Sequence, residues 1–175
     1  MPERILIAGY DPRWPDLFAG EADRIQSALG SRVLRLEHVG STSVPGLAAK
    51  PVIDIVLAVK DSADEAGYVA GLDAAGYTFH RREPHWHEHR MLKRPGTGLN
   101  LHVFSDGCLE IERMLLFRNW LRENAADRIL YQRTKLALAT QEWPTVQHYA
   151  DAKTSVVEEI LLRAAVHSTK PHPES

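Results

Sequence analysis

The sequence predicts an α+β fold in which a mixed β-sheet core is followed by a C-terminal helical segment. The strand-like stretches fall in the first 107 residues, whereas residues 108–167 have helical periodicity alone. The 175 residues, 44% hydrophobic and 25% charged, match the averages of globular chains that bury a core. We therefore expect a core over residues 1–107, a helical segment over 108–167 packed on it, and a disordered tail over 168–175.

The first elements follow from local patterns. A short strand over residues 4–8 precedes a helix over 11–29, in which apolar residues recur every three or four positions until Gly30 ends it. The next strand candidate, residues 32–39, alternates imperfectly. Residues 52–59 form the continuous apolar run that is typical of a buried strand.

The remaining elements are predicted in the same way. A helix over residues 63–75 ends at Gly76, and shorter apolar stretches after it predict three strands. These strands cover residues 77–80, 85–93 and 99–104. The helical pattern that follows predicts three helices. They cover residues 109–123, 126–141 and 146–166.

Charge and composition narrow the classes of function. The net charge is −2, but residues 76–135 contain eleven basic and seven acidic side chains, a local charge of +4. This excess suits phosphate or another small anion rather than long nucleic acid. The sequence has neither a membrane-spanning apolar run nor a secretory signal, and its one cysteine cannot form an internal disulfide. We expect a cytoplasmic protein that contacts no membrane, with its oligomeric state open.

A glycine-serine loop lies between two strand candidates. Gly40 begins a segment without helical or strand periodicity, and its glycines let backbone amides approach a ligand. The segment lacks the lysine-serine ending of a P-loop and the glycine triplet of a dinucleotide fold. Hydroxyls and an ammonium suited to phosphate come from Ser41, Thr42, Ser43 and Lys50.

Asp54 interrupts an otherwise apolar strand. A carboxylate there is costly unless it is paired, hydrogen-bonded or turned toward a metal at a strand end. The alternative is a carboxylate that the backbone amides of an ordinary turn satisfy.

These residues carry a resemblance to known proteins. Gly40-Ser41, twelve residues, then Asp54-Ile55 resembles the signature of the DNA polymerase beta type nucleotidyltransferase superfamily. The longer motif Glu37-His-Val-Gly-Ser-Thr-Ser-Val-Pro-Gly-Leu, followed by Lys50-Pro-Val-Ile-Asp-Ile, resembles the GrpB-like family. Later segments of the chain fit that family as well: Leu101-His-Val, Leu116-Phe-Arg-Asn-Trp-Leu-Arg, Tyr131-x3-Lys135 and Tyr149-x3-Lys153.

The resemblance covers nearly the whole chain. It implies a nucleotidyltransferase-like mixed sheet, a helical C-terminal segment and, because the family also occurs fused to dephospho-coenzyme A kinase, a link to nucleotide or cofactor metabolism. The sequence departs from the nucleotidyltransferase pattern at one position that bears on catalysis. Nucleotidyl transfer normally needs two acids one residue apart to hold Mg²⁺ ions, and the second position here is Val56.

Histidine is the candidate replacement for the missing acids. His85, His87 and His89 alternate on a predicted strand and would share a face. The candidate metal ligands are Asp54, Glu37, His87 and His102, for Mg²⁺ or Mn²⁺, or for a transition metal through histidine. The alternatives are a solvated edge strand, or histidines that bind substrate phosphates with help from nearby arginines.

The C-terminal helices offer cations at repeated spacings. Arg118 and Arg122 lie four residues apart, and each tyrosine of the pairs ending in Lys135 and Lys153 precedes its lysine by four. If the helices pack on the sheet, these cations would converge on the anion. The alternative for each pair is a half-buried tyrosine beside a solvated lysine.

The sequence thus predicts a metal-dependent nucleotidyltransferase. Asp54 is its catalytic carboxylate, and the loop and helical cations bind a nucleotide or other phosphorylated small molecule. Two alternatives stay open: a nucleotide-binding module without catalysis, and a metal-dependent hydrolase that uses histidine and carboxylate ligands.

Overall fold

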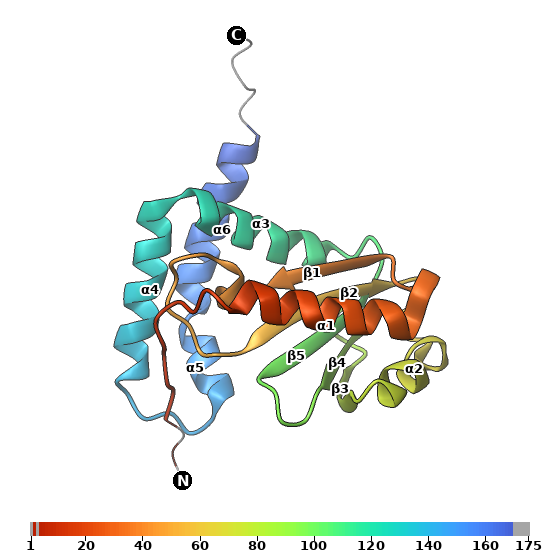
Figure 1. The fold of residues 1–175 in the computed structure, drawn as a ribbon. Helices are drawn as coiled ribbons and strands as arrows, with labels where there is room; N and C mark the ends of the chain where they lie inside the picture. The colour runs from red at the N-terminus through yellow and green to blue at the C-terminus, as the bar shows by residue number, and fades with distance from the viewer. Residues whose placement is uncertain (1, 3, 170–175) are drawn as a thin grey trace.

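A five-stranded mixed β-sheet organises the protein, as the ribbon in Figure 1 shows. The computed structural model describes residue 2 and residues 4–169. The strand order is β1-β2-β5-β4-β3, in which β2 and β5 are parallel and the other neighbours antiparallel. The strands are β1 (Arg35–Val39), β2 (Ile53–Val59), β3 (Thr78–Glu83), β4 (His89–Lys93) and β5 (Leu99–Ser105). The predicted mixed-sheet fold is confirmed.

The described chain also contains six α-helices. In Figure 1, α1 crosses one side of the sheet, while α3 to α6 gather near the segment that links β1 and β2. The helices are α1 (Trp14–Leu29), α2 (Val69–Ala74), α3 (Leu109–Glu123), α4 (Ala125–Ala139), α5 (Val146–Ala152) and α6 (Thr154–Ser168). None of them is long and apolar enough to span a membrane.

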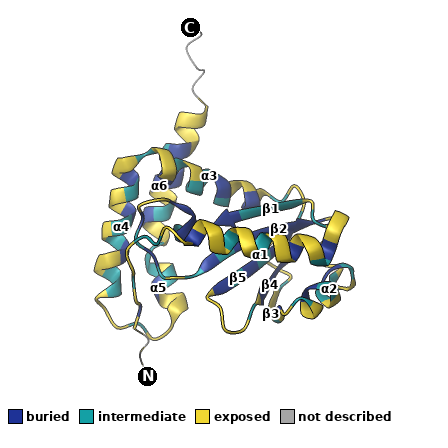
Figure 2. Ribbon diagram, viewed as in Figure 1, coloured by how far each residue is buried: buried dark blue, intermediate teal, exposed yellow. Residues whose placement is uncertain are grey.

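β2 divides two hydrophobic cores because successive side chains of a strand point to opposite faces. Ile55 and Leu57 pack into the core that α1 and α2 cover, whereas Val56 and Ala58 pack with Ile111 of α3. Figure 2 shows the sheet buried between these layers and the outer side of α1 exposed. Each fully buried valine, leucine or isoleucine side chain contributes about 1.5–3 kcal/mol to folding. The sheet is therefore a rigid base for the polar residues at the ends of β2 and β5.

The predicted strand over residues 4–8 is wrong. Ala8 alone pairs, through an isolated antiparallel bridge to Ala49. The next antiparallel partners outward from this bridge would be residues 6 and 51. Residue 51 is a proline, which has no N–H to donate to a ladder.

Two predicted helices are broken. A 3-10 turn over Glu65–Gly67 replaces the first part of the helix predicted over residues 63–75, because Tyr68 leaves the helical region with φ −145°. The hydroxyl of Tyr68 donates to the Ser62 carbonyl at 2.6 Å and holds the break in place. The helix predicted over 146–166 is α5 and α6, which are separated at Lys153. The predicted tail over 168–175 begins on the last residue of α6, and residues 170–175 lie outside the described residues.

The predicted strand over residues 85–93 begins only at His89. Residues 85–88 form the turn of the β3–β4 hairpin, in which Trp86 N–H donates to the Glu83 carbonyl at 3.1 Å. His87 and Glu88 have φ of 55° and 49°, in the left-handed region that non-glycine residues rarely occupy. The prediction that His85, His87 and His89 share one strand face is therefore wrong.

Candidate functional site

A small polar cavity lies where the glycine-serine loop meets the C-terminal helices. Its volume is about 150 Å³. We call this cavity the lysine pocket, because the loop, α4 and the α5–α6 junction each place one lysine in its wall. Its lining is Ile7, Ser41, Thr42, Lys50, Val52, Asp54, Asn100, Lys135, Tyr149 and Lys153.

The loop is fitted tightly to Asp54. Gly40 has φ 74°, and a Cβ atom there would lie 2.6 Å from Asp54 Oδ2, so glycine alone fits without displacing the carboxylate. The Thr42 hydroxyl donates to the Val52 carbonyl at 3.0 Å, and the Ser43 hydroxyl donates to the Gly40 carbonyl at 2.5 Å. These two predicted phosphate ligands brace the loop, and Ser43 lies outside the pocket lining.

The two helical lysines are held over the rings of their own tyrosines. Lys135 Nζ lies 4.9 Å from the ring centroid of Tyr131, and Lys153 Nζ lies 4.5 Å from that of Tyr149. A spacing of four residues stacks side chains on one face of a helix, and a cation over an aromatic face is electrostatically favourable. The Tyr-x3-Lys spacing therefore aims each ammonium rather than leaving it solvated.

The pocket concentrates positive charge in a buried place. Lys135 is only 2% exposed, and its burial, with the charge of Lys153 nearby, lowers its pKa from 10.5 to about 7. Burial and the charge of Lys50 lower the pKa of Lys153 to about 8. Among the described residues that line the pocket, Asp54 is the one carboxylate facing these three lysines. The pocket is thus suited to an anion that carries more than one negative charge.

One buried hydroxyl in the pocket wall has no partner. Tyr149 is 1% exposed, and its hydroxyl is the one buried side-chain polar atom of the described residues that makes no hydrogen bond. An unmet buried hydroxyl costs about 1–3 kcal/mol. Tyr149 lines the same cavity as the lysines, so its unpaired hydroxyl is a candidate partner for a polar ligand atom.

Four side chains, beginning with Asp54, are linked in a row by close polar contacts. Asp54 Oδ1 lies 3.0 Å from His102 Nε2, and His102 Nδ1 lies 3.0 Å from His89 Nε2. His89 Nδ1 lies 2.9 Å from Glu83 Oε2. Asn100 Nδ2 also donates to Asp54 Oδ1, at 3.3 Å. We call Asp54, His102, His89 and Glu83 the histidine chain.

Burial favours the neutral form of His89 in the histidine chain. It lowers the pKa of this imidazole to about 4 and outweighs the hydrogen bond to Glu83, which acts in the opposite direction. A neutral imidazole donates from one ring nitrogen and accepts at the other, so His89 can link Glu83 to His102.

The predicted arginine ligands lie behind the loop rather than in the pocket lining. Arg118 Nη1 donates to Glu37 Oε2 at 2.8 Å and to the His38 carbonyl at 3.0 Å. Arg122 Nε donates to the Ser43 carbonyl at 2.9 Å. Both arginines fasten α3 to the backbone that presents the loop.

The four predicted metal ligands do not converge. Asp54 and His102 are in contact, but Glu37 is bound by Arg118. His87 Nε2 lies 4.0 Å from Oε2 of Glu110 on α3. Within residue 2 and residues 4–169, no group of three or more His, Cys, Asp or Glu side chains is arranged to hold a metal ion. Val56, at the position of the second acid, is fully buried under α3. This donor set does not fit a two-ion site.

Comparison with known proteins assigns the family. The family model described as GrpB protein matches residues 4–163. The chain belongs to the GrpB family. A crystal structure of the conserved protein GrpB from Enterococcus faecalis is 32% identical and superimposes with a TM-score of 0.83, covering 94% of this chain and 100% of that one.

Relatives of this GrpB-family chain include proteins of two kinds. A UPF0157 protein of Halalkalibacterium halodurans is 61% identical over 91% of this chain and 82% of the relative. A UPF0157 protein of Streptomyces coelicolor is 45% identical over 91% and 84%. A dephospho-CoA kinase of Mycobacterium tuberculosis is 30% identical over 87% of this chain but only 43% of the kinase.

Sequence reasoning missed part of the site of this GrpB-family chain. The sequence pattern connected His89 to Asp54 only through a strand face that does not exist, and it did not include Glu83, because these contacts depend on how β3, β4 and β5 pair. The unpaired hydroxyl of Tyr149 was also missed. The signal that could have found it was the Tyr-x3-Lys spacing, which places the tyrosine beside its buried lysine.

Proposed function

We propose that this GrpB-family protein binds a nucleoside triphosphate through the lysine pocket and transfers its nucleotidyl group to an acceptor. The observation that carries the proposal is the placement of buried Lys135 and half-buried Lys153 beside Lys50, with one carboxylate to balance them. A triphosphate chain supplies the missing negative charge and acceptors for the Tyr149 hydroxyl. A cavity of about 150 Å³ holds phosphate groups rather than a whole nucleotide, so the nucleoside lies outside it.

The residues present supply positioning and charge stabilisation, which are the main needs of phosphoryl chemistry. An acceptor oxygen forms a bond to the α-phosphorus, the bond from that phosphorus to the β-phosphate oxygen breaks, and pyrophosphate leaves. The lysines stabilise the negative charge that grows on pyrophosphate. Asp54 is the carboxylate placed to take the acceptor's proton. The histidine chain, of which Asp54 is the first member, holds that proton after the transfer.

A divalent ion, Mg²⁺ or Mn²⁺, stays a prediction. The donor set does not fit two resident ions, so no step above depends on one. Such an ion can enter bound to the triphosphate. Titrations with and without Mg²⁺ measure whether it contributes.

Two further observations support a nucleotide ligand. The Gly40-Ser41 loop and Asp54 resemble the nucleotidyltransferase signature, and the loop touches Asp54 closely enough to require glycine. A region of similarity to proteins named dephospho-CoA kinase also links this kind of chain to nucleotide chemistry.

A second candidate is nucleotide binding without transfer. The observation that favours it is Val56, a fully buried valine at the position where transfer enzymes keep a second acid. The hydrolase alternative has lost its basis, because the three histidines do not share a strand face.

The test combines binding and turnover. Isothermal titration calorimetry with each of the four ribonucleoside triphosphates, with and without Mg²⁺, measures binding, and a coupled assay measures pyrophosphate release with a mixture of hydroxyl acceptors. We expect binding by the wild type, loss of binding in Lys135→Met, and loss of pyrophosphate release in Asp54→Asn. Lys60→Met, which removes an exposed lysine, is the matched control. Binding without pyrophosphate release would favour the second candidate, and absence of triphosphate binding would overturn both.

A further inference from the structure

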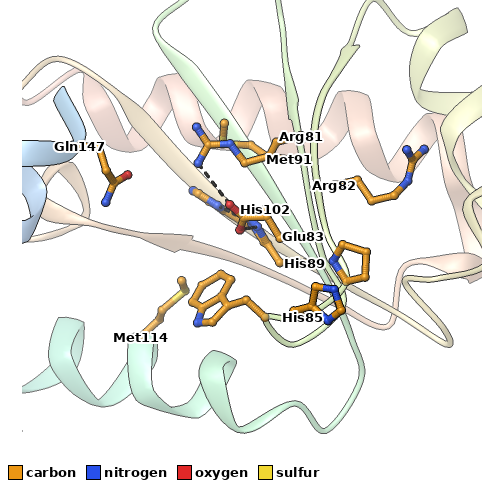
Figure 3. A pocket seen from close by; sticks show the side chains of 11 residues that line it. Arg81, Arg82, Glu83, His85, His89, Met91, His102, Met114 and Gln147 are labelled. Atoms are coloured by element: carbon orange, nitrogen blue, oxygen red, sulfur yellow. Dashed lines mark hydrogen bonds and ion pairs between the residues drawn. The ribbon is translucent and has the colours of Figure 1, made fainter. Parts of the chain in front are cut away.

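A second, larger cavity lies on the other side of His102 from the lysine pocket. Its volume is about 650 Å³, within the range of ligand pockets. Figure 3 looks into this cavity, with His89 and His102 near its centre and Met91, Met114 and His85 around them. We call it the Trp86 pocket, after the largest side chain in its wall.

The walls of the Trp86 pocket are mainly apolar. Trp86 remains 40% exposed although it is a large aromatic residue, and it packs edge-on against His89 with ring centroids 5.0 Å apart. Met91 of β4 and Met114 of α3 form further wall, and methionine adapts to flat aromatic ligands. An aromatic ring in a binding site is the usual partner of such a surface.

The hairpin turn fixes Trp86 in this position. The two residues in left-handed conformation, His87 and Glu88, follow it directly. The Ser62 hydroxyl donates to the Glu88 carbonyl at 2.8 Å, and Arg90 Nη1 donates to Glu88 Oε2 at 3.1 Å. The exposed indole is therefore held by an anchored turn rather than by a loose loop.

Positive charge stands at the rim of the pocket. Arg81 is 48% exposed and has a single contact with a carboxylate, Glu83 Oε1, at 3.3 Å. Arg82, by contrast, is tied to Glu65 by a short bidentate pair. His85, an exposed residue, lies at the same rim. Arg81 is thus the guanidinium best placed to meet an anionic group on a ligand.

We propose that the Trp86 pocket binds the acceptor, and that the acceptor is a planar aromatic molecule with an anionic substituent and a hydroxyl group. The acceptor role rests on the proposed function of the lysine pocket. His102 lines the Trp86 pocket, while its Nε2 contacts Asp54, which lines the lysine pocket. With its ring on Trp86 and its anion on Arg81, the acceptor would present its hydroxyl at His102, the lining residue whose Nε2 contacts Asp54.

Three small probes separate the features of the acceptor. 6-Hydroxy-2-naphthoate has a planar ring, an anion and a hydroxyl, 2-naphthol lacks the anion, and trans-4-hydroxycyclohexanecarboxylate lacks the planar ring. Each is titrated against the wild type without nucleotide, with binding followed by calorimetry and by saturation-transfer NMR. We expect the naphthoate to bind at least tenfold more tightly than either comparison compound.

Variants of the pocket test the same assignment. Trp86→Ala is expected to weaken naphthoate binding at least tenfold, and Arg81→Gln to weaken the naphthoate but not 2-naphthol. Arg133→Gln, which removes an exposed arginine on α4, is the matched control and should change neither. Circular dichroism checks that each variant is folded. Naphthoate binding that is undetectable, or unchanged in folded Trp86→Ala, would overturn the proposal.

A measurement with both ligands separates this inference from the proposed function. We expect ATP to bind Trp86→Ala as it binds the wild type, and interligand nuclear Overhauser effects to join bound ATP and naphthoate in the wild type. ATP binding without naphthoate binding would overturn the Trp86 pocket and leave the proposed function standing. Naphthoate binding without ATP binding would overturn the proposed function and, with it, the acceptor role.

Discussion

Replacing Lys135 by methionine should make the protein more stable and remove its capacity to bind a triphosphate. The ammonium of Lys135 is buried, and a pKa lowered from 10.5 to about 7 means that folding disfavours its charge. At about 1.4 kcal/mol per tenfold change in the proton equilibrium, the penalty is on the order of several kcal/mol. Methionine has a similar length and carries no charge.

The net gain is smaller than this penalty, because the substitution also removes the hydrogen bond from Lys135 Nζ to the Ala48 carbonyl. Replacing buried charges by apolar side chains typically stabilises a protein by about 1–4 kcal/mol. In a chain of this length, each kcal/mol raises the melting temperature by about 2–4 °C. Lys135→Met should therefore melt several degrees above the wild type at pH 6.

The pH dependence of this gain has a defined sign. Between pH 7 and pH 10.5 the unfolded lysine still binds its proton, while the folded one has released it, so the stability of the wild type rises with pH. The advantage of Lys135→Met should be largest below pH 7 and shrink toward pH 10. Lys60→Met, whose lysine is exposed, should show neither the gain nor its pH dependence.

Thermal unfolding by differential scanning calorimetry, at pH 6 and pH 9 and with and without ATP, measures all of these quantities. ATP at a hundred times its dissociation constant should stabilise the wild type by about 2.7 kcal/mol. It should leave Lys135→Met unaffected. A variant that melts lower than the wild type at pH 6 and is still stabilised by ATP would show that Lys135 neither costs stability nor binds the triphosphate.

Three other predictions follow from the same contacts. Triphosphate affinity should fall several-fold as pH rises from 6 to 9, since Lys135 and Lys153, with pKa values of about 7 and 8, lose their charge in this interval; calorimetry across that range checks it, and a flat profile would contradict it. Tyr149→Phe removes a hydroxyl that has no partner, so it should keep or raise the melting temperature and weaken ATP binding by about 0.5–1.5 kcal/mol, the net value of one hydrogen bond; unchanged affinity would show that the hydroxyl does not meet the ligand. Gly40→Ala should destabilise the protein by about 1–3 kcal/mol, because its φ is positive and its Cβ would collide with Asp54 Oδ2; a chemical denaturation curve like that of the wild type would rule out the tight fit.

The fold class and several elements were readable from local patterns. The apolar run of β2 and the amphipathic pattern of α1 depend on residues close in sequence, and both elements form within a few residues of the predicted bounds. The Tyr-x3-Lys spacing is equally local. In the structure Lys135 and Lys153 lie in one cavity with residues of the glycine-serine loop, and the role of these lysines in binding stays a prediction.

The histidines show what local patterns cannot supply. Alternating His85, His87 and His89 match a strand by spacing, yet Pro84 and the hydrogen bonds of the hairpin make residues 85–88 a turn. Only the pairing of β4 with β5 brings His89 against His102. The same holds for Arg118, whose contact with Glu37 depends on how α3 crosses β1.

The most direct test is a crystal structure of the protein with a non-hydrolysable ATP analogue. We expect the β- and γ-phosphates to lie between Lys50, Lys135 and Lys153, with a phosphate oxygen within hydrogen-bond distance of the Tyr149 hydroxyl. Phosphates bound elsewhere on the protein, with the lysine pocket free of the analogue at saturating concentration, would contradict this expectation.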